Sequence, residues 1–386
     1  MTAGPTAPSY GWRVGSLRGV PVFIGRSYPL IALVVVGLTA FRVPDPRTGQ
    51  TGGLYGVAVG VASALLLLVS VLVHEGAHAV VAARLGHRVD RIVADVWGGH
   101  TVYDGGVARP GSSAAIAVSG PVANLVVAGL AYAARGPVGD GTPGLLLSYL
   151  FLGNLLLGVV NLLPGLPLDG GFVVDSLVWK VTGSRHVGLL VAGWLGRLLV
   201  VAAVLLLVGL PLLRGASPAP FTVVYVALIG AFLWNGATAA VRAGGNGRAM
   251  ERVPVGQVLR PVASAGVHEP LGQVLARLDG FPGAVVVHAP DGRPAGLLDR
   301  EAAHAVHPAD LTAGLTTAAV LLRQPPGWAV VVDPAADSAV LVDAVVSAGG
   351  GPDDPVPALV VVLDPSGRPV GSVSLSELDA AVRARR

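Results

Sequence analysis

Long apolar stretches dominate the chain up to about residue 245, and shorter alternating patterns follow them. A helix needs roughly 20 mostly apolar residues to cross the hydrocarbon core of a bilayer, with wide tolerance. By that measure the pattern predicts about six membrane-spanning helices, of which the first is short. They cover residues 27–41, 55–85, 112–134, 144–163, 187–213 and 221–241.

Two shorter segments alternate apolar and polar residues instead. Residues 14–26, around Pro21, indicate a strand or an interfacial hairpin, and residues 89–102 indicate a short hairpin. Sheet structure is tolerated at membrane depth when it lines a cavity. The second hairpin is therefore a candidate surface for pairing with an extended peptide.

Basic residues in the short loops orient these helices. If the N-terminus is cytoplasmic, the outside loops hold only Arg42, Arg47, Arg135 and Arg214. Since cytoplasmic loops are enriched in Lys and Arg, this distribution favours a multi-pass protein with both termini in the cytoplasm. The inside segments then hold Arg13, Arg18, Arg26, Arg84, Arg88, Arg91, Arg109, Lys180, Arg185, Arg242, Arg248 and Arg252.

Composition excludes an ordinary soluble protein. Hydrophobic residues make up 53% and charged residues 13% of the chain, and the mean hydropathy is +0.68. The net charge of +3 reflects juxtamembrane Arg, which suits anionic lipid rather than nucleic acid. Arg far outnumbers Lys, and Ala, Gly and Val abound, which is typical of a high-GC bacterium and indicates the bacterial plasma membrane.

A metal-hydrolase motif lies inside the second predicted span. His74 and His78 are one helical turn apart in the sequence His74-Glu75-Gly76-Ala77-His78, so both imidazoles project from one face and can bind one Zn²⁺. Glu75 lies beside them, where a carboxylate can accept a proton from a water that the ion has made more acidic. His and Glu are costly in hydrocarbon, so this position favours a functional role over two chance core histidines.

A catalytic zinc site usually has three protein ligands, so a third must come from elsewhere. The predicted span 144–163 is followed by Pro164-Gly-Leu-Pro167-Leu168-Asp169-Gly170-Gly171, where one carboxylate lies between prolines and glycines. Such a turn can direct Asp169 back into a helix bundle. The alternative is an ordinary helix-ending turn in which Asp169 caps the next element. The chain contains no Cys, which excludes thiolate ligands and disulfides.

These motifs together resemble the site-2 protease family of intramembrane zinc metalloproteases. The similarity rests on the His-Glu-x-x-His sequence, on Asn161-x-x-Pro164-x-x-Pro167-Leu168-Asp169-Gly170, and on two smaller matches, Gly98-Gly99 and Gly120-Pro121-x-x-Asn124. The resemblance implies zinc bound by His74, His78 and Asp169, with Glu75 as the catalytic base. It also implies that Asn161 positions substrate or stabilises the developing oxyanion. Phe172 departs from the family, in which basic residues are common at this place.

The second half of the chain contains an internal repeat after the linker-like Gly244-Gly245-Asn246-Gly247. Residues 285–296 recur as residues 360–371, and each copy predicts a strand, a turn, a second strand and a helix, the helices covering 300–306 and 376–383. The repeat resembles a tandem pair of cystathionine-β-synthase-type (CBS) domains, which implies an α/β module that often binds adenine nucleotides such as ATP.

The residues expected to hold ribose are present in one copy only. They are Ser374 and Glu377 in the second copy, whereas Asp299 and Ala302 stand at the same places in the first. At most one nucleotide site is therefore predicted. A degenerate pair that serves homodimerisation or substrate docking is the open alternative.

The sequence thus predicts a polytopic α-helical membrane protein followed by a cytoplasmic α/β CBS pair. Residues 1–245 form the intramembrane metalloprotease domain and residues 246–386 the regulatory domain. The expected activity is hydrolysis of peptide bonds in or near transmembrane segments of membrane-bound protein substrates. The alternative is a catalytically silent sensor or zinc-handling protein gated by the CBS pair. Glu75 favours the enzyme, because a site that only binds metal needs no acid–base carboxylate.

Three further side chains are interpreted without a catalytic role. Arg197, in the fifth predicted span, is expected to snorkel or to pair, with Asp175 as the candidate partner. His87 and His100 are expected at the surface or the membrane interface rather than on the metal.

Overall fold

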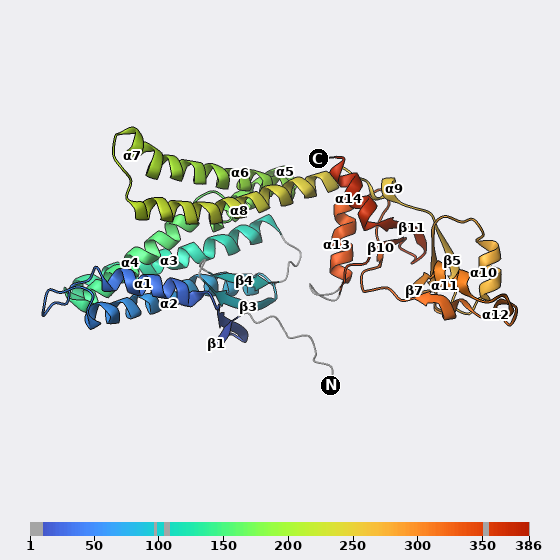
Figure 1. Cartoon of the computed structure of the whole chain (residues 1–386), viewed down its shortest axis with the longest axis horizontal. Helices are drawn as coiled ribbons and strands as arrows, with labels where there is room; N and C mark the ends of the chain where they lie inside the picture. Colours follow the sequence, from blue (N-terminus) through green and yellow to red (C-terminus); the bar gives the residue numbers. More distant parts are fainter. Residues whose placement is uncertain (1–10, 96–98, 104–108, 350–354, 386) are drawn as a thin grey trace. The chain divides into compact units, whose positions relative to one another are not determined.

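The computed structural model describes residues 11–95, 99–103, 109–349 and 355–385. The chain divides into two compact units, Met1–Gly244 and Gly245–Arg386 (Figure 1). Helix α8 (Pro220–Met250) runs through the division, so the predicted linker 244–247 is helical. Gly244 in this segment packs closely against α6 (Arg185–Val204), because a Cβ at this position would lie 2.6 Å from the His186 carbonyl oxygen and 2.8 Å from the Leu190 nitrogen.

Within the described residues, five helical segments are long and apolar enough to cross a membrane. The first predicted span is shorter than the others: α1 (Tyr28–Ala40) has 13 residues and rises about 20 Å, against a core of about 30 Å. The residues before it are used by a strand that ends at Ile24. The five segments are α2 (Leu54–Arg84), α3 (Pro110–Val138), α4 (Thr142–Asn161), α6 (Arg185–Val204) continued through η1 (Leu205–Gly209) and α7 (Leu210–Leu213), and α8.

Helix α1 packs against the first half of α2 through two glycines. A Cβ at Gly56 would lie 2.8 Å from the Ala40 carbonyl oxygen, and one at Gly60 would lie 2.8 Å from the Val36 Cα. Small residues four apart let two helix backbones approach closely in a membrane, where van der Waals packing replaces the hydrophobic effect. The Tyr28 hydroxyl also donates to the Ala64 carbonyl at 2.6 Å. α1 is thereby fixed beside α2.

Both segments predicted from alternation are strands of one four-stranded sheet. Strands β1 (Trp12–Leu17) and β2 (Val20–Ile24) form an antiparallel hairpin, and β3 (Val89–Ala94) and β4 (His100–Tyr103) form another. β2 and β3 pair in parallel, which gives the order β1-β2-β3-β4. Figure 1 shows this sheet beside the metal-motif half of α2. β4 is consequently an edge strand of the sheet.

A helix that the pattern did not predict carries the candidate third ligand. α5 (Asp169–Thr182) begins at Asp169 and is followed by Gly183, which adopts the left-handed conformation favoured by glycine. The turn before it includes a cis Leu166–Pro167 bond. A Cβ on Gly170 or Gly171 would collide with the backbone of residues 162–166, so the glycines fold this turn tightly onto itself.

The second unit repeats one topology twice. A strand, a helix, two strands and a helix occur as β5, α10, β6, β7 and α11, and again as β9, α13, β10, β11 and α14. The first and second strands of each repeat are parallel, and the second and third are antiparallel. The bounds are β5 (Val262–Gly266), α10 (Leu271–Arg277), β6 (Ala284–His288), β7 (Pro294–Leu298), α11 (Arg300–Ala305), β9 (Ala329–Val331), α13 (Ser338–Ala348), β10 (Leu359–Leu363), β11 (Pro369–Ser374) and α14 (Leu375–Arg383).

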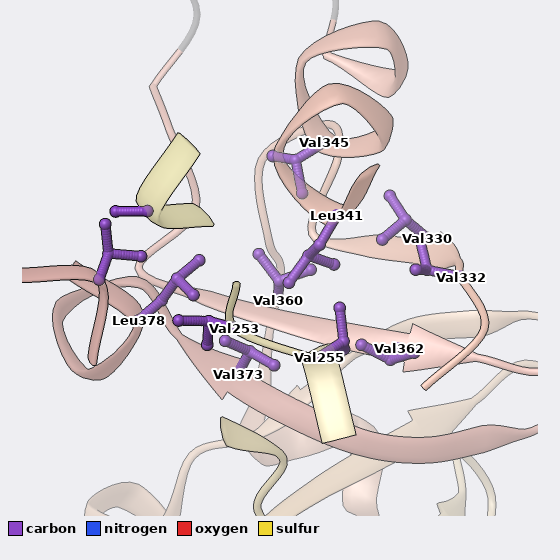
Figure 2. Close-up of a cluster of buried hydrophobic side chains, with 12 residues drawn as sticks. Val253, Val255, Val330, Val332, Leu341, Val345, Val360, Val362, Val373 and Leu378 are labelled. Atoms are coloured by element: carbon purple, nitrogen blue, oxygen red, sulfur yellow. The ribbon is translucent and has the colours of Figure 1, made fainter. Parts of the chain in front are cut away.

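Shorter elements complete this unit: α9 (Val255–Val258), α12 (Pro308–Thr312), η2 (Thr317–Val320) and β8 (Leu321–Leu322). The two repeats meet through Val286 and Leu297 of the first and Val361 and Leu363 of the second. Figure 2 shows the largest of the three clusters of buried apolar side chains, built around Val360, Val362 and Leu341. The repeat in the sequence is therefore a repeat of fold.

We expect Leu341→Ala to lower the free energy of unfolding of the second unit by about 2–5 kcal/mol, because the fully buried side chain leaves a cavity. Val340→Ala, next to it on α13 but 47% exposed, should change stability by less than about 0.5 kcal/mol. Pulse proteolysis of the full-length protein in detergent and urea, followed with a C-terminal tag, measures both. Equal losses of unfolding free energy in the two variants would contradict the assignment of Leu341 to the core of this unit.

Candidate metal centre

Three side chains from two helices converge on one point. His74 and His78 are buried on α2, and Asp169 is the first residue of α5. The two imidazole Nε2 atoms are 3.1 Å apart, and Asp169 Oδ2 lies 3.0 Å from the first and 3.5 Å from the second. The three ligand atoms all lie within 4.8 Å of one another. The structure therefore brings together the three residues that the sequence nominated as ligands.

The surroundings of these atoms fit a zinc ion. Asp169 Oδ2 is buried and has no hydrogen-bond partner, so it is free to coordinate a cation. Two neutral imidazoles and one carboxylate form a donor set that zinc accepts in catalytic sites. Gly120 of α3 lies against the same point: a Cβ there would collide with His78 Nε2 and lie 2.7 Å from His74 Nε2. The absence of a side chain at position 120 leaves the coordination space open.

The outer nitrogens of both histidines are held as well. His78 Nδ1 donates to the Ile116 carbonyl at 2.7 Å, and Ser119 Oγ lies 3.3 Å from the same nitrogen. His74 Nδ1 lies 2.5 Å from Asn124 Oδ1. Metal-binding histidines commonly use the second nitrogen in this way, which fixes the ring and directs the lone pair of Nε2 toward the ion.

Glu75 is held beside the ligands by strand β4. The Thr101 hydroxyl lies 2.8 Å from Glu75 Oε2 and 3.0 Å from the Glu75 carbonyl oxygen, and its one proton is shared between these two acceptors. A Cβ at Gly99 would lie 2.9 Å from Glu75 Cγ, so only glycine lets the strand approach this closely. The other glycine of the matched pair, Gly98, lies outside the described residues. The carboxylate of Glu75 is thus buried and oriented without being a ligand.

Two clefts of about 330 and 350 Å³ flank the three ligands. Both are lined by Glu75 and Asp169 and by residues 99 and 100 of the β3–β4 hairpin. Asn161, the last residue of α4, lines the second cleft together with His74. Phe172, Tyr103 and Arg185 line the first. A peptide in either cleft would pass directly by Glu75.

His100 has a larger part in this site than the sequence suggested. Its side chain is half-exposed, as expected of an interfacial residue, but it lines both clefts. Asp95 Oδ2 lies 3.6 Å from His100 Nδ1, and this carboxylate raises the pKa of the imidazole. His87 instead makes an edge contact with Tyr103. The β4 strand therefore brings a second kind of proton-carrying group to the cleft.

The predicted pairing of Arg197 with Asp175 is wrong. Arg197 donates to Thr238 Oγ1 at 3.2 Å, and its guanidinium lies over the rings of Trp194 and Trp234. Asp175 is fully buried and lies 3.8 Å from Arg185, in the first turn of α6. Twelve residues of helix, about 18 Å, separate Arg185 from Arg197, so one carboxylate cannot reach both.

The two residues proposed for nucleotide binding have other partners in this structure. Glu377 accepts two hydrogen bonds from the Arg260 guanidinium, at 2.8 and 3.1 Å, and Ser374 Oγ lies 2.7 Å from Ser376 Oγ. In the first repeat, Asp299 caps α11 by accepting from the Ala302 backbone nitrogen. Both repeats thus have a polar residue at the same helix start, Asp299 and Ser374, but three residues further on the first has Ala302 and the second has the carboxylate of Glu377.

Sequence reasoning missed Thr101 and two buried side chains behind Asn124: Asn154 Oδ1 accepts from Asn124 Nδ2, and Ser70 Oγ accepts from Asn154 Nδ2. Thr101 lies in an alternating segment whose contact with Glu75 exists only after the hairpin folds onto α2. Asn154 had a detectable signal, because an amide in the middle of the apolar run 145–163 is costly unless it is paired. Ser70 gives no comparable signal, since Ser is common in membrane helices.

We expect Gly120→Ala to abolish stoichiometric zinc binding, because the added methyl would occupy the space between the two Nε2 atoms. Gly129→Ala on the same helix is the matched control, since a Cβ there meets nothing within 4 Å. Metal analysis of the purified proteins measures zinc per chain for each. Full zinc content in Gly120→Ala would contradict the coordination space described above.

Comparison with known proteins gives matches to about half of the chain. Residues 140–206, which include Asn161 and Asp169, match the model of peptidase family M50. The protein sll0528 of Synechocystis, provisionally described as a zinc metalloprotease, is 35% identical over 187 residues, 48% of this chain and 48% of its own. The zinc metalloprotease MJ0392 of Methanocaldococcus jannaschii is 27% identical over 179 residues, 45% of this chain and 48% of its own. The aligned part of the chain spans about half the length of these relatives.

Solved structures match parts of the chain with lower scores. The site-2 protease from Methanocaldococcus jannaschii has a TM-score of 0.42 at 22% identity, and covers 60% of this chain and 95% of its own. The CBS domain of a bacterial CNNM/CorC family Mg²⁺ transporter has a TM-score of 0.25 at 17% identity, over 36% of this chain and 82% of its own. These scores are too low to establish a common fold by themselves. The sequence matches nevertheless show that about half of the chain resembles zinc metalloproteases, and that residues 140–206 resemble peptidase family M50, the site-2 protease family.

Proposed function

We propose that the protein is an intramembrane zinc endopeptidase that hydrolyses peptide bonds in or near transmembrane segments of membrane-bound proteins. The observation that carries this proposal is the convergence of Asp169, from α5, on His74 and His78, which lie with Glu75 on α2, a helix of membrane-spanning length. The match of residues 140–206 to an M50 peptidase model supports it. A site that only stores or senses zinc has no use for a carboxylate held at this position.

Each residue of the site has a chemical role in the proposed reaction. His74, His78 and Asp169 would hold zinc, which when bound polarises a carbonyl and makes a water more acidic. Glu75 accepts the proton of the attacking water and passes it to the departing amine. Thr101 keeps the Glu75 carboxylate in place during this transfer. Asn161, which lines the second cleft, would donate to a substrate carbonyl or to the developing oxyanion.

The sheet edge supports a substrate in extended conformation. In the described part of the chain, β4 pairs with β3 on one side only. A peptide hydrogen-bonded along the other side of β4 would pass Gly99 and Thr101, both of which contact Glu75. A transmembrane helix must unwind to bind in this manner, since a helix has already used its backbone donors.

The distribution of Arg and Lys supports a multi-pass protein of the bacterial plasma membrane with the metal centre nearer the cytoplasmic face. His74 and His78 lie in the last third of α2, which ends at Arg84. Placing both chain termini in the cytoplasm requires α1 and its flanking residues to cross the bilayer as a sixth segment. Local thinning of the bilayer is the usual accommodation for so short a helix.

We further propose that the second unit is a CBS-type regulatory pair that binds an adenine nucleotide at Ser374 and Glu377. The repeated strand and helix topology supports the pair, and the carboxylate at the start of α14 supports one site. Binding would replace the Arg260 guanidinium on Glu377 by ribose hydroxyls. Homodimerisation through this unit is the alternative use of the same module.

We expect Glu75→Gln to lower cleavage by about 10²–10⁴-fold while zinc binding is retained, because only the proton acceptor is lost. The protein is co-expressed with a panel of tagged single-span membrane proteins, and fragment size is followed by blotting. Glu301→Gln in the second unit is the matched control and should cleave normally. Cleavage by Glu75→Gln at the wild-type rate would contradict the role of this carboxylate. Zinc binding without cleavage of any panel member would favour the sensor.

We expect Ser374→Ala and Glu377→Ala each to weaken ATP binding about tenfold, the effect of one lost hydrogen bond to a charged group or ribose. Titration calorimetry on the full-length protein in detergent measures the affinity. Asp299→Ala, at the same place in the first repeat, should leave it unchanged. No detectable binding by the wild-type protein, or equal loss in Asp299→Ala, would contradict a single site in the second repeat.

A further inference from the structure

A chain of buried hydrogen bonds leads from the metal centre into the bundle. His74 Nδ1 lies 2.5 Å from Asn124 Oδ1, and Asn124 Nδ2 donates to Asn154 Oδ1 at 2.7 Å. Asn154 Nδ2 in turn donates to Ser70 Oγ and to the Leu150 carbonyl, both at 2.8 Å. Ser70 Oγ donates to the Leu66 carbonyl at 2.7 Å. The chain joins α2, α3 and α4.

The direction of every bond in this chain follows from its far end. Backbone carbonyls can only accept, so the Ser70 hydroxyl must donate to Leu66 and can accept from Asn154. The amide nitrogen of Asn154 therefore points to Ser70, and its oxygen is left to accept from Asn124. The oxygen of Asn124 then faces His74, which must carry its proton on Nδ1. The Nε2 lone pair is thereby free for a metal.

The two histidines differ in how this proton is placed. His78 faces a backbone carbonyl directly, so its tautomer is set by one contact. His74 faces a carboxamide, whose oxygen and nitrogen exchange places when the group rotates by half a turn. A rotated Asn124 would present donors to His74 Nδ1 and place the proton on Nε2, where it blocks coordination. A weaker bond from Asn124 Nδ2 to the Ser70 carbonyl, at 3.4 Å, opposes that rotation.

We propose that Asn154 and Ser70 are positioning residues that set the tautomer of His74 through Asn124 and so raise the affinity of the site for zinc. The proposal rests on the proposed function for the identity of the metal. Asn124 and Asn154 are fully buried, and Ser70 is almost so. Asn154 lies in an otherwise apolar part of α4, where an unpaired amide would cost several kcal/mol.

Helix association alone explains part of this arrangement, because buried amides hold membrane helices together. Helix association requires that the buried polar atoms be hydrogen-bonded, but it does not require that each hydrogen bond run in a particular donor-to-acceptor direction. The two explanations therefore predict that substitutions in this series change different measured quantities. Loss of association lowers the stability of the metal-free protein, whereas loss of direction lowers zinc affinity.

The experiment compares Ser70→Thr with Ser70→Val in the full-length protein. Both add the same methyl group to the buried site, but only Thr keeps a hydroxyl that can donate to Leu66 and accept from Asn154. Zinc dissociation constants are measured by chelator competition, and the absorption of the Co²⁺-loaded protein reports the ligand set. Thermal unfolding of the metal-free protein is measured in parallel.

We expect Ser70→Thr to bind zinc within about threefold of the wild type, and Ser70→Val and Asn154→Leu to bind about 10–100-fold more weakly, as is usual when the second contact of a metal-binding histidine is lost. Asn235 lies on α8 and takes no part in this series of hydrogen bonds. The Asn235→Leu variant should therefore bind zinc as the wild type does. The Co²⁺ spectrum of Ser70→Val should also differ from that of Ser70→Thr.

Equal zinc affinity of Ser70→Thr and Ser70→Val, with a difference only in metal-free stability, would overturn the proposal in favour of helix association. A wild-type protein that binds zinc but cleaves nothing would overturn the protease, while the same comparison still decides the role of Ser70. A wild-type protein that binds no zinc would overturn both.

Discussion

The cost of placing polar groups in hydrocarbon is the constraint on which the membrane unit depends. An ionisable or amide side chain inside a spanning helix must find partners, or the fold loses several kcal/mol for each. The chain meets this cost by collecting such groups in one place. His74 is hydrogen-bonded to Asn124 and Asn124 to Asn154, Thr101 donates to Glu75, His78 donates to Ile116, and Asp169 lies beside both histidines. Stability and chemistry therefore draw on the same contacts.

Close backbone approach is what makes this collection possible. Gly120 leaves room between the two imidazoles, Gly99 lets β4 reach Glu75, and Gly170 and Gly171 fold the turn that delivers Asp169. In each case a methyl group would meet a ligand, a carboxylate or a backbone atom. These glycines matter for the space they leave, and Gly244 shows the same principle inside α8, where the residues 244–247 are helical and packed.

The two units distribute apolar and polar side chains in opposite ways. The membrane unit leaves many large apolar side chains on its surface, such as Leu65 at 58% exposed and Leu198 at 62%, and collects polar groups inside. The second unit buries many Val and Leu side chains of its strands, such as Val287 and Val360 at 0% exposed, and places its ion pairs, such as Arg260–Glu377, on the outside. Each arrangement suits the medium that the sequence predicts for it, a bilayer for the first unit and water for the second.

Local sequence by itself determined the features that depend on spacing along the chain. The apolar runs gave the long helices, alternation gave the two hairpins, and one helical turn placed His74 and His78 on the same face. The internal repeat gave the repeated topology of the second unit, and the turn around Asp169 indicated this residue as the candidate third ligand. These succeed because helix and strand periodicity relate neighbours in sequence to neighbours in space.

Tertiary structure alone decided the features that join distant segments. The short α1, the helix α5, the pairing of Asp175 with Arg185, the contact of Thr101 with Glu75 and the route from His74 to Ser70 each depend on how helices and strands pack. Ser70 and His74 are neighbours on one helix, yet their connection runs through Asn124 and Asn154 on two others. No periodicity in the sequence encodes such a route, because hydrogen-bond partners across helices are selected by crossing geometry and by the cost of leaving a buried polar atom unpaired.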